Sequence, residues 1–223
     1  MDQTVKKIED SVINFLQELP PEVTLVAAAK TRTLEEVEAA IRGGIRHVGY
    51  NYVQEGLPII EAVGDRVKWH MIGHLQRNKA KFVADHFDVC ETVDSLRLAK
   101  YLDQRCAMVG RELPVLIEIN SGEETNKNGV LPENLVELIE KISQLKNIKV
   151  QGLMTMGPRF GSPEQSRPYF QLTRKAFESI KAQKFPNVDM RYLSMGMSNS
   201  YKIAIEEGAN IVRIGTQLFG ERE

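Results

Sequence analysis

The 223-residue sequence predicts an α/β fold in which eight parallel strands and their connecting helices close into a single (β/α)8 barrel. Eight short apolar runs alternate with amphipathic helical patterns, as in parallel sheets with right-handed crossovers. The length lies within the range of one such barrel. No Gly-x-Gly-x-x-Gly turn follows the first strand, which argues against the alternative, a doubly wound open sheet. We therefore expect one barrel domain over residues 1–223, with an extra helix before its first strand.

The first half of the chain predicts this leading helix and four strand–helix pairs. Apolar residues at helical spacing fill positions 5–19, and Pro20-Pro21 stops the helix. Thr33 and Glu36 have the form of a capping box, and Asn51 is expected to cap the helix that follows it. The expected strands are 25–30, 46–49, 67–72 and 89–93, and the helices after them are 33–43, 51–63, 78–84 and 95–109.

The second half repeats the alternation four more times. Leu113–Ile119 is a clear buried strand, and Pro163 is expected to open a long helix. The expected strands are 113–119, 148–154, 190–193 and 210–214, and the helices after them are 135–142, 163–183, 201–207 and 216–219.

Composition excludes several classes of protein. The chain is 42% hydrophobic and 26% charged with a net charge of -1, so no basic surface for nucleic acid or membrane is expected. No apolar run is long enough to cross a bilayer, and the charged N-terminus does not resemble a signal peptide. Cys90 and Cys106 offer no disulfide framework, which favours a reducing cytoplasm. Because barrel closure leaves little surface to bury, we expect a monomer.

Lys30 is the first candidate for chemistry, at the end of the apolar stretch Leu25–Thr31. A lysine at the carboxyl end of a buried strand has an apolar floor beneath it. Burial there would disfavour the charged ammonium, and a neutral lysine is a nucleophile towards carbonyl groups. The alternative is a lysine that extends to the surface from a strand end.

Two glycine-containing loops predict a phosphate site. In barrels of this class, functional groups lie at the carboxyl ends of strands, and phosphates often bind after strands seven and eight. The expected seventh strand leads into Ser194–Ser200, where Ser198 offers a hydroxyl, and the eighth leads into Gly215-Thr216. A strand-end lysine near a phosphate site suggests an aldehyde phosphate as ligand, either pyridoxal phosphate or a sugar phosphate.

Six sequence blocks, in the same order along nearly the whole chain, resemble the pyridoxal phosphate homeostasis protein family. The resemblance implies an alanine-racemase-like barrel that handles pyridoxal 5′-phosphate without an established catalytic reaction. The blocks are Ala28–Thr31, Asn51–Glu55, Trp69–Lys79, Gly152–Met156, Ser194–Ser198 and Val212–Thr216.

The resemblance also implies residue roles. Lys30 would form the internal aldimine, and Asn51 would lie beside the cofactor ring. Arg213 would approach the pyridine nitrogen. The phosphate would be held by Ser198, Gly215 and Thr216.

Two residues depart from the family pattern. Tyr50 stands where Glu is usual, which could alter the surroundings of the ring. Ser200 stands where Asp is common, which could weaken the cap of the following helix. Neither departure changes Lys30 or the expected phosphate donors.

His74 and Met154 complete the predicted site. His74, at the carboxyl end of a strand, either lines the pocket or has a structural hydrogen-bonding role. Met154 is either pocket wall or core. His70 and His74 have the i, i+4 spacing of a metal pair, but they lie on a strand and its loop without the His-Glu-x-x-His order, so no metal site is expected.

The residues and the resemblance together favour a cytoplasmic protein that binds pyridoxal phosphate on Lys30 and buffers or delivers it, with PLP-dependent apoenzymes among its expected partners. Such a protein would influence vitamin B6 and amino-acid balance. Three alternatives stay open: an amino-acid racemase, a Schiff-base aldolase acting on a sugar phosphate, and a regulatory protein controlled by its cofactor. The resemblance implies that a racemase needs a tyrosine from an additional C-terminal domain. Because the sequence stops at Glu223, we expect no such domain, and Tyr50 is the one local substitute. We therefore expect no robust catalytic turnover.

Overall fold

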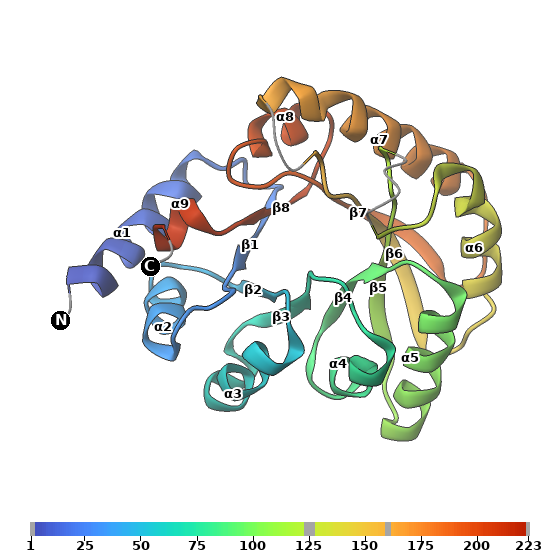
Figure 1. Ribbon diagram of the computed structural model, residues 1–223, viewed down its shortest axis with the longest axis horizontal. Coiled ribbons are helices and arrows are strands. Elements are labelled where there is room, and N and C mark those ends of the chain that lie inside the picture. Colours follow the sequence, from blue (N-terminus) through green and yellow to red (C-terminus); the bar gives the residue numbers. More distant parts are fainter. Residues whose placement is uncertain (1–2, 123–127, 159–161, 222–223) are drawn as a thin grey trace.

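The eight strands form one closed parallel barrel in which each strand pairs with its neighbours in chain order and β8 pairs with β1. The computed structural model describes residues 3–122, 128–158 and 162–221. Figure 1 shows the strands inside a ring of helices. The strands are β1 (Thr24–Ala28), β2 (His47–Tyr50), β3 (Lys68–Met71), β4 (Val89–Val93), β5 (Leu113–Glu118), β6 (Ile148–Met154), β7 (Val188–Ser194) and β8 (Ile211–Ile214).

Helices connect successive strands, as the alternation of patterns predicts. The α-helices are α1 (Gln3–Glu18), α2 (Leu34–Arg42), α3 (Val53–Val63), α4 (Ala80–His86), α5 (Leu96–Val109), α6 (Leu135–Ile142), α7 (Arg167–Ala182), α8 (Tyr201–Glu206) and α9 (Thr216–Phe219). Short 3-10 turns are η1 (Gly64–Arg66), η2 (Arg77–Lys79), η3 (Pro132–Asn134) and η4 (Pro163–Ser166). No helix in these described ranges is long and apolar enough to cross a membrane.

The predicted extra helix, α1, packs on the outside of the barrel against α2 and α9 (Figure 1). A glycine at the end of α2 allows this close approach. A Cβ atom on Gly43 would lie 2.8 Å from the carbonyl oxygen of Glu9 and 2.9 Å from the Cβ of Val12. Arg42 adds an ion pair to Glu9 at 3.2 Å. The N-terminal segment is therefore an integral part of the helical layer.

The local capping predictions have different outcomes. The capping box at Thr33 is confirmed, because its side chain accepts from the N–H of Glu36 and the Glu36 carboxylate accepts from the N–H of Thr33. The prediction that Asn51 caps α3 is wrong, because Tyr52 occupies the N-cap position and makes no capping hydrogen bond. The helix expected from Pro163 begins as the 3-10 turn η4 and becomes α-helical at Arg167.

Side-chain alternation along the strands divides the buried residues into two sets. Most of the core lies between the barrel and its helices. A second, small cluster fills the barrel interior with Val26, Ile72, Leu116, Met154 and Ile211. Because so few apolar side chains lie inside, other interior positions carry polar groups, and these form the floor of the candidate site.

Candidate functional site

The turn after β1 holds Lys30 beside the aromatic ring of Tyr52. The Lys30 Nζ lies 5.1 Å from the centroid of this ring, within cation–π range. The next residue, Thr31, has a φ of 64°, which is a strained conformation for a β-branched residue. Its N–H donates to the Glu55 carboxylate of α3 at 3.1 Å. The loop that carries Lys30 is thus fixed by a contact from the neighbouring unit.

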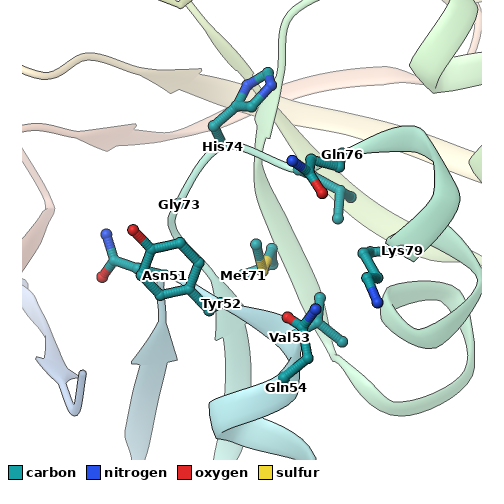
Figure 2. A pocket seen from close by; sticks show the side chains of 10 residues that line it. Asn51, Tyr52, Val53, Gln54, Met71, Gly73, His74, Gln76 and Lys79 are labelled. Carbon is teal, nitrogen blue, oxygen red and sulfur yellow. The ribbon is translucent and has the colours of Figure 1, made fainter. Parts of the chain in front are cut away.

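A cavity of about 240 Å³ opens between the ends of β2 and β3, and Figure 2 shows its lining side chains. Asn51 and Tyr52 lie on one side of the cavity, and Gln76 and Lys79 lie on the other. Gly73 is required at the back, because a Cβ there would lie only 2.3 Å from the Asn51 carbonyl oxygen. We call this space the side cavity.

A second cavity, of about 390 Å³, lies at the carboxyl-terminal mouth of the barrel and shares Asn51, Gly73 and His74 with the side cavity. We call it the upper cavity. Its further lining includes Glu118 and Met156. The two cavities together bring the ends of β2, β3, β5 and β6 around the mouth of the barrel.

A chain of hydrogen bonds runs through the barrel interior below the upper cavity. Arg213 donates to the Ser194 hydroxyl at 2.6 Å, and this hydroxyl donates to Glu91 Oε2 at 2.6 Å. Glu91 Oε1 lies 2.6 Å from His70 Nδ1, and His70 Nε2 lies 2.9 Å from His47 Nδ1. We call these five residues the interior network.

The upper end of the network is the Arg213 guanidinium, which is 3% exposed. It donates to the carbonyl oxygen of Thr155 at 2.8 Å and lies 3.3 Å from the sulfur of Met156, a residue of the upper cavity. His47, at the lower end, lines a different cavity at the amino-terminal mouth. The network therefore spans the barrel between its two mouths.

Burial and charge set the ionisation of the network. Burial opposes ionisation of Glu91, but the hydrogen bond and charge of His70 and the charge of Arg213 together hold its pKa below the ordinary value. Glu91 Oε2 and Arg213 Nη1 are 4.0 Å apart. Burial, followed by the nearby His70, lowers the pKa of His47 to about 4. Glu91 is therefore the anion that balances the buried guanidinium.

The loops after β7 and β8 lie together beside the end of β1. The backbone N–H of Arg213 donates to the Gly196 carbonyl oxygen at 3.1 Å, and the Gln217 side chain donates to the Ser198 carbonyl oxygen at 2.9 Å. A Cβ on Gly215 would lie 3.3 Å from the Ala28 carbonyl oxygen, so this position is close to the strand that leads to Lys30. The fold thus brings both predicted phosphate loops to the lysine-bearing strand.

The predicted site residues take different positions within this arrangement. Asn51 and His74 line the side cavity, and Lys30 lies against the ring of Tyr52, another residue of its wall. His74 also approaches Asp94, with 3.7 Å between Nδ1 and Oδ2. Ser198 is half-buried and lines an outer groove next to α8, and Thr216 is exposed at the start of α9.

Met154 is fully buried in the interior cluster and does not line the upper cavity, whereas Met156 does. The two departures from the family pattern also find a place in the structure. Tyr50 is fully buried in the core between the sheet and the helices, where Gly56 and Trp69 are its neighbours. Ser200 is the N-cap residue of α8 without a capping side-chain hydrogen bond, as expected for a weakened cap.

Sequence reasoning missed Glu91, Ser194 and Glu118. A signal was present, because an acidic residue inside an otherwise apolar strand must have a partner or a function when it is buried. The partners could not be identified in advance, since Ser194 lies 103 residues from Glu91 along the chain. His70, considered only as a metal ligand, belongs to the same network, and no group of potential metal ligands is found within the described ranges.

Known proteins share both the sequence and the fold. A family model described as alanine racemase, N-terminal domain, matches residues 6–223. The pyridoxal phosphate homeostasis protein of Aquifex aeolicus is 44% identical over 200 residues, covering 89% of this chain and 87% of that protein. The protein of the same name from Escherichia coli K12 is 39% identical over 218 residues, covering 92% and 88%.

Solved structures agree. PipY of Synechococcus elongatus without PLP superposes with a TM-score of 0.90 at 33% identity, covering 96% of this chain and all of that one. The PipY structure with PLP bound has a TM-score of 0.88 at 32% identity over the same shares. Alanine racemase from Corynebacterium glutamicum, at 15% identity, shares the fold with a TM-score of 0.78 and is covered over 62% of its length.

The closed parallel barrel and the family model that matches residues 6–223 define an alanine-racemase-like barrel. Such barrels occur in proteins of more than one function, so sequence identity decides the family. With relatives at 39–44% identity over about nine-tenths of its length, this chain belongs to the pyridoxal phosphate homeostasis protein family.

The ion pair inside the barrel leads to a stability prediction. Glu91→Gln should lower the free energy of unfolding by about 3–5 kcal/mol at neutral pH, because it leaves the Arg213 charge buried without its counterion. Since the pKa of Glu91 is lowered on folding, its contribution is present above the ordinary carboxyl pKa and is lost as the pH falls through the folded-state pKa. The difference in the free energy of unfolding between Glu91→Gln and the wild type should therefore become smaller at acidic pH.

Chemical denaturation of the cofactor-free protein between neutral and acidic pH measures this effect. The matched control is Glu112→Gln, which makes the same change at a side chain that is 64% exposed and should cost no more than about 0.5 kcal/mol. A Glu91→Gln variant as stable as this control would contradict the proposed charge balance.

Proposed function

We propose that this protein binds pyridoxal 5′-phosphate on Lys30 and acts as a carrier that buffers or delivers the cofactor inside the cell. The observation that carries the proposal is the position of Lys30. It lies in the turn after β1, which ends at Ala28 and not at Lys30 as the sequence predicts, and the Gly215 loop approaches this strand end. The ring of Tyr52, which lines the side cavity, lies beside its Nζ atom. The names of the relatives and the PLP-bound structure of PipY support the proposal.

The donor set fits the chemical groups of this cofactor. When bound, pyridoxal phosphate supplies an aldehyde that condenses reversibly with a primary amine. Lys30 is the amine proposed to hold it. Ser198 and Thr216 offer hydroxyls for the phosphate, and the glycine at position 215 lets backbone approach an anion. Asn51 and His74, on the wall shared by the two cavities, would orient the ring.

Arg213 sets the electronic character of the proposed site. A guanidinium stays charged in proteins, and its position under the upper cavity is fixed by Ser194 and the carbonyl oxygen of Thr155. A positive charge near the pyridine nitrogen disfavours its protonation. The ring is then a weaker electron sink, which favours storage and transfer over carbanion chemistry.

The position of Tyr50 also supports a carrier. A racemase needs an acid or base on each face of the substrate α-carbon. Tyr50 was the local candidate for the second face, but its hydroxyl lies in the apolar layer under α3 and is among the buried polar atoms with no partner in the described ranges. Burial, and then the charge of Glu55, raises its pKa further from neutrality.

We propose that the recipients are PLP-dependent apoenzymes and that the carrier works in the cytoplasm as a monomer.

Trapping with borohydride tests the role of Lys30. The wild-type protein incubated with pyridoxal phosphate should yield a reduced adduct on the peptide that contains Lys30, identified by mass mapping. Lys30→Ala should lose this adduct and the absorbance of the imine, because Lys30 is the amine proposed to hold the cofactor. Lys79→Ala is the matched control, since Lys79 is a second amine that lines the side cavity and its loss should leave trapping intact. Mapping of the wild-type adduct to Lys79 would overturn the assignment.

Exchange of the α-proton of alanine distinguishes a carrier from a catalyst. With L- or D-alanine in deuterated water, we expect exchange far slower than the turnover of ordinary enzymes, roughly 1–10³ s⁻¹. Tyr50→Phe should behave like the wild type, because the hydroxyl does not reach the cavities. Exchange at enzymatic rates in the wild type that is lost in Tyr50→Phe would identify a racemase instead.

A further inference from the structure

Glu118 is a buried acid that the proposed function does not use. It is the last residue of β5, and its side chain lines the upper cavity. The residue is only 7% exposed, yet its Oε2 atom has no hydrogen-bond partner in the described part of the chain. Buried polar atoms without a partner are rare in native proteins, and such an atom on a cavity wall is typical of a ligand contact.

The charges around Glu118 determine which ligand fits. Asp94, from the loop after β4, faces it with a negative charge, and His74 lies 3.7 Å from Asp94. Arg213, from β8, is the nearby cation, but Glu91 and the Ser194 hydroxyl already engage it. Burial, followed by the charge of Asp94, raises the pKa of Glu118 to about 7, with Arg213 offsetting part of the rise. A further positive charge in the cavity would favour the ionised form.

We propose that the upper cavity binds a primary ammonium group, with the Glu118 carboxylate as its anionic partner. An ammonium offers three donors and a positive charge, and it would satisfy the unpartnered oxygen. The phosphate and phenolate oxygens of the cofactor would be repelled by the same carboxylate. Ammonium binding itself does not depend on the proposed function, but the role of the bound molecule does. A molecule that accepts the cofactor from Lys30 must present an amine.

Two sources can supply this ammonium group: a free amino acid, or a lysine side chain of a recipient protein. Glycine and Nα-acetyl-lysine amide represent these sources as probes. Binding of each to the cofactor-free full chain is measured by calorimetry at pH 6 and pH 8. Affinity should rise about tenfold over this interval, because a carboxyl group with a pKa of about 7 changes from mostly neutral to mostly ionised while the amine stays protonated.

Glu118→Gln is the decisive variant, because it preserves shape and hydrogen-bonding capacity and removes the charge. It should weaken the preferred probe at least tenfold at pH 8 and abolish the pH dependence, whereas Glu118→Asp should keep part of both. Glu112→Gln makes the same change in charge at the opposite mouth of the barrel and should bind as the wild type does. Preference for glycine or for the lysine derivative identifies the source.

The outcomes separate this inference from the function itself. Equal affinity of wild type and Glu118→Gln for both probes, or no binding of either, would overturn the ammonium site, even if borohydride trapping on Lys30 succeeds. A Glu118→Gln variant that binds the probes normally but alters the absorbance of the loaded protein would also overturn it, because Glu118 would then be a neutral donor to the cofactor. Loss of wild-type trapping with normal probe binding would refute the carrier and leave the ammonium site standing.

Discussion

The pairing of Arg213 with Glu91 inside the barrel is the constraint on which the rest of the site depends. Both side chains are almost completely buried, and neither charge could be kept there alone at an acceptable cost. Ser194 bridges them, and His70 with His47 extends the hydrogen-bonded chain towards the other mouth. A barrel core that is normally filled by branched apolar side chains is thus partly replaced by a charge-balanced polar network.

The interior network fixes the position of the Arg213 guanidinium below the carboxyl-terminal mouth of the barrel. Because the guanidinium is fixed from below and from the side, it presents a stable positive charge under the upper cavity. The loops at this mouth carry different functional groups: one carries Lys30, and two carry hydroxyls. Glu118, whose Oε2 atom has no partner in the described residues, lines the upper cavity. A rigid interior with functional loops at one mouth is the usual arrangement of barrels.

The sequence predicts the barrel well because its strands are short apolar runs with clear ends, and because signals such as the Thr33 capping box are local. The same local reasoning predicted Asn51 as the N-cap of α3. This prediction is wrong, because Asn51 lines the upper cavity and Tyr52 occupies the N-cap position. The partners of Glu91 come from three other strands, so no local pattern could identify them. Strand alternation could have shown that Tyr50 faces away from the site, since its neighbour Asn51 faces the cavity.

The protonation state of the bound cofactor tests the central claim most directly. Nitrogen NMR of the protein loaded with pyridoxal phosphate labelled at its pyridine nitrogen reports this state. We expect an unprotonated nitrogen at neutral pH, because the Arg213 cation, held by Ser194 and balanced by Glu91, lies under the cavity. A protonated pyridine nitrogen at neutral pH would contradict both the proposed placement of Arg213 against the ring and the proposed carrier role that depends on it.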